Sequence, residues 1–279
     1  MKMNQKKQVS AKEIQVAKDA LERYSGSHPD LFCEYVLITN FPKYVEYFAE
    51  TRKVDIHEGS MFTAAHCKKD QVSILDFKIG SPSAALVVDL CSYLPIQACL
   101  LLGMCGGLRR RYKKGEYLIP VAAIRGEGTS DYYFPIEVPA LSNFLVQRAV
   151  SEVLDEEKAT YHIGITHTTN KRFWEFDETF KDRLKANRSQ AIEMECATLF
   201  AGSYRRKLPL GALLLISDLP LNEAKTKASS DEVFEKYTED HVEKGVKIIQ
   251  QLKKLQKNNA RGAYRPEVSE IETENPHEN

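Results

Sequence analysis

The sequence has no excess of charge of either sign and no long hydrophobic run. Its 279 residues contain 39 lysines and arginines against 39 aspartates and glutamates, so the formal net charge is zero. A neutral chain lacks the strongly charged surface that attracts nucleic acid or membranes. The apolar run at 210–217 is far shorter than the roughly 20 residues that span a bilayer. We therefore expect a small-molecule partner, with no nucleic acid and no membrane.

The sequence also lacks paired cysteines. Its six cysteines are scattered without a C-x-x-C pair, and neither they nor the seven histidines show the spacing of a metal site. The basic stretch at 1–15 has no apolar core of the kind found in signal peptides. We expect buried thiols in a reducing compartment, hence a cytoplasmic protein, with no metal or organic cofactor.

What the sequence does contain is an alternation of strand-like and helical segments. Ser10 and Glu13 form a capping box before a first helix that ends near Gly26. Continuous apolar runs predict strands, covered on both faces, at 33–39, 71–78, 98–104, 116–124, 161–167 and 210–217. Helical periodicity predicts helices at about 81–94, 138–154, 175–187, 196–207 and 230–255.

One α/β domain is expected, because no internal repeat and no Gly/Ser-rich linker divides the chain. We divide it into an N-terminal helix at 1–29, a main domain at 30–257 and a tail at 258–279 whose polar composition is typical of disorder. Ligands of mostly parallel sheets bind beyond the carboxyl ends of the strands. The residues that follow each apolar run are therefore the candidates for a site.

Asp218 is the first candidate. It follows the most apolar of the strands, and Pro220 prevents that strand from continuing. A carboxyl group held at the end of a rigid element suits a general acid. The alternative interpretation is an aspartate in an ordinary turn or helix cap.

The second candidate is IEMEC, where Glu193 and Glu195 flank Met194. Side chains at i and i+2 of an extended segment point to opposite sides, so only one glutamate can face a site. Glu195 would lie at the start of the 196–207 helix, where its charge is favoured. From there it could accept hydrogen bonds from a sugar diol while Met194 packs on the sugar. A first-turn glutamate without a ligand is the alternative.

Small residues at strand ends are the third candidate. In IGSPSAALVVDL, Ser81, Pro82 and Ser83 can start a helix whose free N–H groups face a ligand. In LGMCGGLRRR, the glycines allow the backbone to approach a ligand closely. Neither segment is a Walker loop or a Rossmann fingerprint, and turn glycines are the alternative.

Taken together, the three segments resemble the nucleoside phosphorylase and nucleosidase superfamily. Its members share a Gly-x-Cys-Gly segment, a Glu-Met-Glu segment and a Ser-Asp pair, which appear here in that order at 103–107, 193–195 and 217–218. The resemblance covers the chain from about residue 33 to the last helix. It implies a single-domain three-layer sandwich with a mixed, largely parallel central sheet flanked by helices, and it makes 30–257 the catalytic domain.

MCGGLR, and HTTNKRFWEF followed by IEMECATLF, resemble more narrowly the members that hydrolyse AMP. The resemblance implies that Asp218 protonates N7 of the departing adenine, and that Glu195 and Met194 hold the ribose. Glu193 would belong to the shell of residues around those that contact the sugar, and Phe173 or Trp174 would stack on the purine. The short chain is expected to lack the extra N-terminal regulatory domain of longer members.

The sequence departs from the phosphorylases where they bind inorganic phosphate. Those enzymes use an arginine in a Gly-Asp-Pro-x-Arg loop and another just before Gly-x-Cys-Gly. Here Tyr44 stands at the first position, and the second falls within Leu100–Leu102. Each lost charge-assisted hydrogen bond to phosphate forfeits roughly 1.5–3 kcal/mol. Water is therefore the expected nucleophile.

The resemblance thus predicts hydrolysis of AMP to adenine and ribose 5-phosphate. A purine nucleoside phosphorylase and a catalytically silent nucleotide sensor are the alternatives. A homo-oligomer, with a hexamer as the expected form, would use the apolar stretch 131–146 as a contact unless that stretch is core. The candidates for the 5′-phosphate pocket are Arg109 and Arg125, His57 or His66 contributed across a subunit contact, and the hydroxyls of Thr129 and Ser130. Each of them could instead be an ordinary surface residue.

Overall fold

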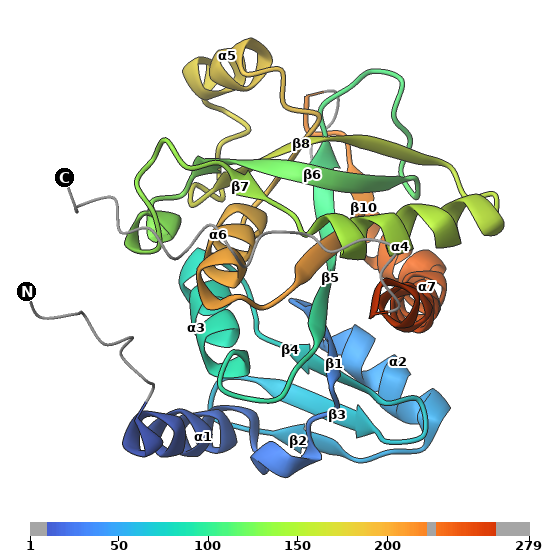
Figure 1. Ribbon diagram of the computed structural model, residues 1–279. Helices are drawn as coiled ribbons and strands as arrows, with labels where there is room; N and C mark the ends of the chain where they lie inside the picture. The colour runs from blue at the N-terminus through green and yellow to red at the C-terminus, as the bar shows by residue number, and fades with distance from the viewer. Residues whose placement is uncertain (1–9, 222–226, 261–279) are drawn as a thin grey trace, which may run out of the picture.

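The computed structural model describes residues 10–221 and 227–260 (Figure 1). The α-helices are α1 (Ala11–Ser25), α2 (Pro42–Arg52), α3 (Ser81–Cys91), α4 (Phe144–Glu156), α5 (Glu178–Ala186), α6 (Cys196–Arg206) and α7 (Lys227–Ala260). The strands are β1 (Tyr35–Thr39), β2 (Ile56–Glu58), β3 (Thr63–Cys67), β4 (Val72–Asp76), β5 (Ala98–Gly107), β6 (Tyr117–Gly126), β7 (Ala140–Leu141), β8 (Tyr161–Thr169), β9 (Ala191–Glu193) and β10 (Leu210–Asp218).

All the strands belong to one mixed sheet with the order β10-β6-β8-β9-β5-β1-β4-β3-β2, and β7 pairs with β6. The longest ladders, β6–β8 and β5–β10, are parallel, as is the pairing of β1 with both β4 and β5. Because β10 pairs with β5 as well as β6, the strands β5, β9, β8, β6 and β10 form a closed ring.

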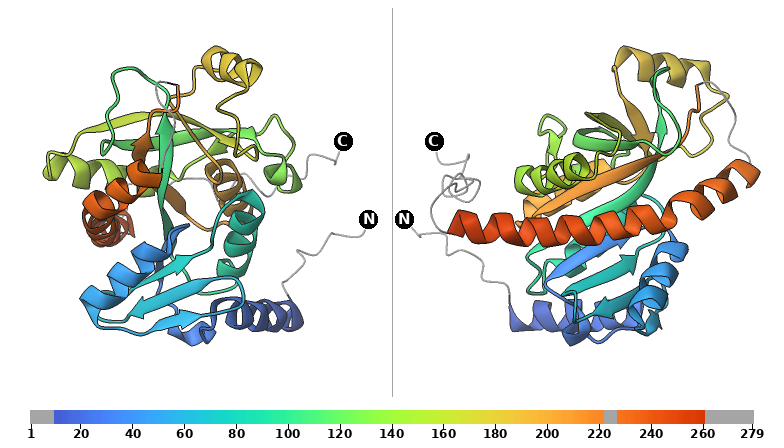
Figure 2. Two further views of the ribbon diagram at one scale, coloured as in Figure 1. Left: turned by 180° about the vertical axis from the view of Figure 1, so that it is seen from behind. Right: turned by 90° about the vertical axis from the view of Figure 1, so that its right-hand side faces the viewer.

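The sheet separates two hydrophobic cores, which gives the three expected layers. Buried residues of α1, α3 and α6 pack on one face, and buried residues of α2, α4 and α7 pack on the other. Figures 1 and 2 show the same division, with α7 crossing the molecule beside the sheet. The predicted fold class is therefore confirmed.

Local signals explain where most helices begin. The capping box of Ser10 and Glu13 is present at the start of α1, which ends at Gly26 in the left-handed conformation. α4 and α5 begin later than their periodicity suggested, because Asn143 and Asp177 accept hydrogen bonds from the first turns as N-caps. α7 extends to Ala260, so 258–260 is helical, and the rest of the predicted tail lies outside the described residues.

Three elements near the N-terminus were not predicted. The loop expected at 39–44 leads directly into α2, where Pro42 occupies the first turn, a position that proline tolerates. β2 and β3 form an antiparallel hairpin at the edge of the sheet. The edge strand β2 is largely exposed, and the mostly buried β3 is only five residues long with small or polar side chains, so neither has the long apolar run that identified the central strands.

The expectation that every strand is covered on both faces is wrong for β8. Gly164 is buried, whereas its neighbours Ile163 and Ile165 are 57% and 39% exposed. Val121 of β6 and Leu141 of β7, on the strands paired alongside, are 42% and 55% exposed. One side of this part of the sheet thus carries apolar side chains that no described helix covers.

Within the described residues, no helix is both long and apolar enough to cross a membrane. The longest helix, α7, is amphipathic. Its buried stripe includes Val242, Val246, Ile249 and Leu252, as its periodicity predicted.

Candidate active site

A pocket of about 220 Å³ opens at the carboxyl ends of the central strands. Residues of the loops that follow β1 and β4 line it, as do residues at the ends of β5, β8 and β10. The described lining consists of Asn40, Phe41, Ile79, Met104, Cys105, Gly106, Thr169, Lys171, Arg172, Trp174, Glu175, Ile192, Glu193, Met194, Glu195, Ser217, Asp218, Pro220, Val233 and Phe234. Asp218, Glu195 and Met194, predicted from strand ends far apart in the sequence, therefore share one pocket.

Glu193 caps helix α6. Its Oε2 accepts hydrogen bonds from the backbone N–H groups of Glu195 (2.7 Å) and Cys196 (2.6 Å). Its Oε1 accepts from the hydroxyl of Thr168 on the neighbouring strand (2.5 Å). Glu193 thus performs the capping that its position next to α6 allows, and the side chain of Glu195 makes no capping bond.

Glu195 is instead directed to the start of α3. Its Oε1 accepts a hydrogen bond from the Gly80 N–H (2.7 Å) and a long one from the Asn40 amide (3.5 Å). Ser81 donates to the Met194 carbonyl (2.7 Å), which fixes the same corner of the chain. One backbone N–H at this helix start, that of the N-cap residue Gly80, therefore holds the glutamate of the pocket.

The two glutamates are buried close together, and this raises the pKa of both. Burial, then the charge of Glu193, raises the pKa of Glu195 to about 8. Burial also raises the pKa of Glu193, against the hydrogen bonds from Thr168 and from the start of α6. Two carboxyl groups in such a site resist being ionised together, so the pair retains a proton at pH values where exposed glutamates have lost theirs.

Asp218 ends β10, opposite Gly106 of β5, and a register shift separates it from Ile216. Ser217 donates a hydrogen bond to Asp218 Oδ1 (2.5 Å) and contacts the Cys105 carbonyl (3.3 Å). The aspartate is thereby attached to the end of the neighbouring strand.

Gly106 explains part of the Gly-x-Cys-Gly segment. A Cβ at this position would lie 2.8 Å from Pro220 and 3.2 Å from Ile192. The glycine therefore lets two other walls of the pocket approach β5, in addition to lining the pocket itself.

The two aromatic candidates differ in position. Trp174 is 5% exposed, lines the pocket and packs against Phe180 with the ring centroids 5.6 Å apart. Phe173 is 81% exposed and lies outside the lining. Of the two alternatives, the structure favours Trp174, because Phe173 is directed to solvent and cannot stack on a ligand in the pocket.

Arg125 does not provide a cationic pocket, because its guanidinium is saturated by its own loop. It donates to the Ser130 hydroxyl (2.9 Å), to the Asp131 carboxylate (2.8 Å) and to the backbone carbonyls of Pro135, Val138 and Phe134. Its side chain is 4% exposed. Ser130 is buried as part of this network. The expectation for Arg125 and Ser130 is therefore corrected.

His66 is a core histidine. Its ring nitrogens bond the hydroxyls of Ser73 and Ser27, each at 2.9 Å, and burial lowers its pKa to about 3. It is neutral near pH 7 and has no nitrogen left for a phosphate. His57 lies on the edge strand β2 with its ring 5.3 Å from that of His66, outside the pocket of its own chain. A contribution of His57 to the pocket of a second copy stays a prediction.

Arg109 and Thr129 also lie outside the described lining. Arg109 follows β5 and donates to the backbone carbonyls of Leu108 (3.3 Å) and Arg188 (2.5 Å), so it ties two surface segments together. Thr129 begins a short 3₁₀ turn after β6.

Two cations that were not predicted border the pocket. Among the described residues, Lys171 and Arg172 are the lysine and arginine of the lining. They follow β8 within HTTNKRFWEF, so the strand-end argument that found Asp218 could also have found them. The described residues contain no group of three or more potential ligands that could hold a metal ion.

The chain belongs to the phosphorylase superfamily, because the model of that family matches residues 34–253. The matched region contains the whole pocket.

Relatives within this family are named for different reactions. The chain is 26% identical to the AMP nucleosidase of Escherichia coli over 87% of its own length, and it spans 60% of that protein. It is 32% identical to a guanosine phosphorylase of Halorubrum lacusprofundi over 63% of its length and 73% of that protein.

Solved structures share the fold. The crystal structure of AMP nucleosidase from Bacteroides thetaiotaomicron matches with a TM-score of 0.77 and 35% identity, covering 88% of this chain and 99% of that one. A uridine phosphorylase from Vibrio fischeri has a TM-score of 0.71 at 17% identity, which indicates the fold alone.

Proposed function

We propose that this protein is an enzyme that hydrolyses the N-glycosidic bond of AMP, releasing adenine and ribose 5-phosphate. The observation that carries the proposal is the shared pocket, in which Asp218, Glu195, Met194 and Trp174 converge from separate elements. Its similarity to two proteins named AMP nucleosidase supports the same substrate.

The proposed mechanism divides the work between two carboxyl groups. Trp174 stacks on the purine, and Asp218 donates a proton to N7 as the bond between C1′ and N9 breaks, with the electron pair going to the base. Glu195 accepts hydrogen bonds from the ribose hydroxyls, which strengthen as the sugar approaches an oxocarbenium ion. Water then forms the new bond to C1′ and loses its proton to solvent.

Water is favoured over phosphate as the nucleophile by the residues at the positions of the two phosphorylase arginines. Tyr44 is fully buried, and its hydroxyl bonds the buried His241 (2.8 Å). Leu102 is fully buried in the same core. An anion next to such residues would be desolvated without gaining a partner.

The test is to incubate the purified protein with AMP and with adenosine, with and without inorganic phosphate, and to follow free adenine. We expect release from AMP in phosphate-free buffer and less from adenosine. Release that requires inorganic phosphate would instead identify a purine nucleoside phosphorylase, which the similarity to guanosine and uridine phosphorylases keeps as the second candidate. Binding of AMP without release would identify a nucleotide sensor.

We further propose that the protein forms a homo-oligomer, with a hexamer as the expected form. Tyr132, Ile136, Leu141 and Phe144, all within 131–146, are between 55% and 91% exposed. An apolar surface of this kind supports a contact with a second copy.

A further inference from the structure

The β8–α5 loop places two adjacent cations beside the pocket. Lys171 lies two residues after the end of β8, and its backbone N–H donates to the Thr169 hydroxyl (3.0 Å), which fixes the loop at the strand end. Arg172 is next, and Trp174 lies two residues further on, with all four residues in the lining. Figure 1 shows α5 and this loop standing apart from the two main helical layers.

Both cations are held by weak partners. Lys171 pairs with Asp177, and Arg172 pairs with Glu175 at 3.1 Å. The lysine and arginine side chains are 49% and 47% exposed. The partner carboxylates of Asp177 and Glu175 are 34% and 22% exposed. Ion pairs with half-exposed cations are screened by water, so a phosphate with a higher charge can displace these carboxylates.

The remaining charges of the pocket are carboxyl groups. Glu193 and Glu195 come from the β9–α6 corner, Asp218 comes from the end of β10, and Glu175, the partner of Arg172, lies on the β8–α5 loop itself. A phosphate dianion close to them would be repelled, whereas Lys171 and Arg172 supply positive charge from a different wall. Arg125 and His66 cannot take this role, because their nitrogens are already bonded within the fold.

We propose that Lys171 and Arg172 form the subsite for a phosphate monoester, the 5′-phosphate of the nucleotide. This inference rests on the proposed function and identifies how the pocket distinguishes a nucleotide from a nucleoside. Arg172 can bind two phosphate oxygens at once, and Lys171 adds a compact charge.

The experiment uses the single tryptophan of the chain as a reporter. Because Trp174 lines the pocket, its fluorescence reports binding without any turnover. AMP, adenosine, ribose 5-phosphate and inorganic phosphate are titrated into the unmodified protein and into Lys171→Met and Arg172→Met. Lys181→Met and Arg183→Met, on α5 outside the lining, are the matched controls.

We expect each pocket variant to raise the Kd for AMP and for ribose 5-phosphate about 10- to 100-fold, as the loss of a charge-assisted phosphate contact should. The ratio of adenosine to AMP affinity should change by the same factor. In the control variants, the Kd for AMP should change by less than about threefold. An equal loss for adenosine and AMP, or no loss for either, would overturn the proposal.

Two further outcomes are informative. One distinguishes binding of free inorganic phosphate from binding of the nucleotide's 5′-phosphate, and the other distinguishes failure of the phosphate subsite from failure of the proposed hydrolysis. If only inorganic phosphate loses affinity in the variants, the cations bind a free co-substrate and the proposal is wrong. If AMP binding depends on them but no adenine is released, the phosphate subsite stands and the proposed hydrolysis does not. Should a variant unfold, ionic strength provides a second measurement, because added salt should weaken AMP binding more than adenosine binding.

Discussion

At the residue scale, the pair Glu193 and Glu195 shows how one short motif performs two tasks. The carboxylate of Glu193 accepts hydrogen bonds at the N-terminus of α6, so the carboxyl group of Glu195 is the one available to a ligand in the pocket. The expectation that only one of them faces the site is corrected, because both glutamates line the pocket and the charge of Glu193 acts on Glu195. The chain turns into α6 at Glu195, so the alternation of an extended segment does not apply there. The energetic consequence is an elevated pKa for both carboxyl groups.

Glu195 should make stability depend on pH. Its pKa is about 8 in the folded protein, above the usual value for glutamate, so the folded state binds the proton more tightly than the unfolded state. The stabilisation is complete below the unfolded pKa and is lost as pH rises through about 8. We expect the urea midpoint to fall between pH 5 and pH 8 for the unmodified protein, and to fall less for Glu195→Gln. Equal pH dependence of the two midpoints would contradict the elevated pKa.

Asp218 should matter for turnover rather than for binding. General acid catalysis contributes about 10²–10⁴-fold, so Asp218→Asn should lower kcat for adenine release by that factor. The Kd for AMP, measured by Trp174 fluorescence, should stay within about threefold. Asp182→Asn, on the exposed side of α5, is the control. A variant that releases adenine at the original rate would remove Asp218 from the mechanism.

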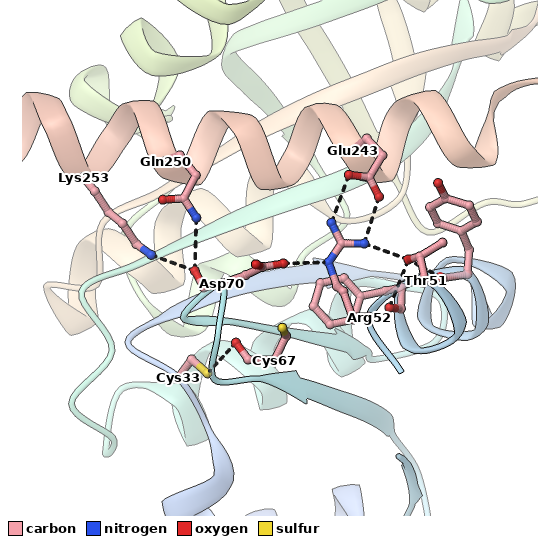
Figure 3. Close-up of polar contacts among 10 residues, drawn as sticks. Cys33, Thr51, Arg52, Cys67, Asp70, Glu243, Gln250 and Lys253 are labelled. Atoms are coloured by element: carbon pink, nitrogen blue, oxygen red, sulfur yellow. Dashed lines mark hydrogen bonds and ion pairs between the residues drawn. The ribbon is translucent and has the colours of Figure 1, made fainter. Parts of the chain in front are cut away.

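At the scale of elements, α7 is attached to the sheet by a polar clamp as well as by its apolar stripe. Arg52, at the end of α2, makes a double hydrogen bond to Glu243 of α7 (2.8 and 3.0 Å) and bonds Asp70 in the β3–β4 turn (3.0 Å). The backbone carbonyl of Asp70 also accepts from Gln250 and Lys253 (Figure 3). The clamp therefore holds α7 to both α2 and the β3–β4 turn.

This clamp predicts an effect of Arg52 on both stability and binding. Its side chain is 11% exposed, so Arg52→Met leaves two partly buried carboxylates without their partner and should cost about 1–3 kcal/mol of unfolding free energy. Because Val233 and Phe234 of α7 line the pocket, AMP affinity should fall as well. The control Arg148→Met removes an exposed i,i+4 pair with Glu152 and should cost less than about 0.5 kcal/mol. Equal urea midpoints for the two variants would contradict the clamp.

At the scale of the whole molecule, the closed ring of strands brings distant residues to one pocket. β5 pairs with β1 on one side and with β10 and β9 in the ring, so the ends of these strands meet. The ring also leaves one side of β6, β7 and β8 apolar and exposed.

That exposed side predicts the position of an oligomer contact. If copies associate there, Ile163→Lys should reduce the mass measured by light scattering from a multiple of 31.7 kDa towards that of one chain, because a charge would be buried without a partner. Val16→Lys, which replaces an equally exposed valine of α1, should leave the mass unchanged. An unchanged mass for Ile163→Lys would place the contact elsewhere or exclude it.

The sequence by itself determined the central strands and the residues at their ends. Continuous apolar runs identify buried strands, and Asp218, Met194 and Glu195 stand directly after such runs or at a helix start. These signals are local, so they can be recognised in the sequence without knowledge of the fold. The same reasoning missed α2 and the edge hairpin, because their boundaries depend on one proline and on pairing rather than on apolar runs.

Only the tertiary structure decided which charged side chains are available to a ligand. The sequence suggested Arg125 and His66 as phosphate ligands and did not suggest Lys171 or Arg172. In the fold, carbonyls at 134–138 bond Arg125 and two serine hydroxyls bond His66. A side chain of the same chemistry is a ligand-binding group or a structural one according to the partners that long-range packing places around it. Sequence spacing does not encode those partners, because they come from segments that are close only in the folded chain.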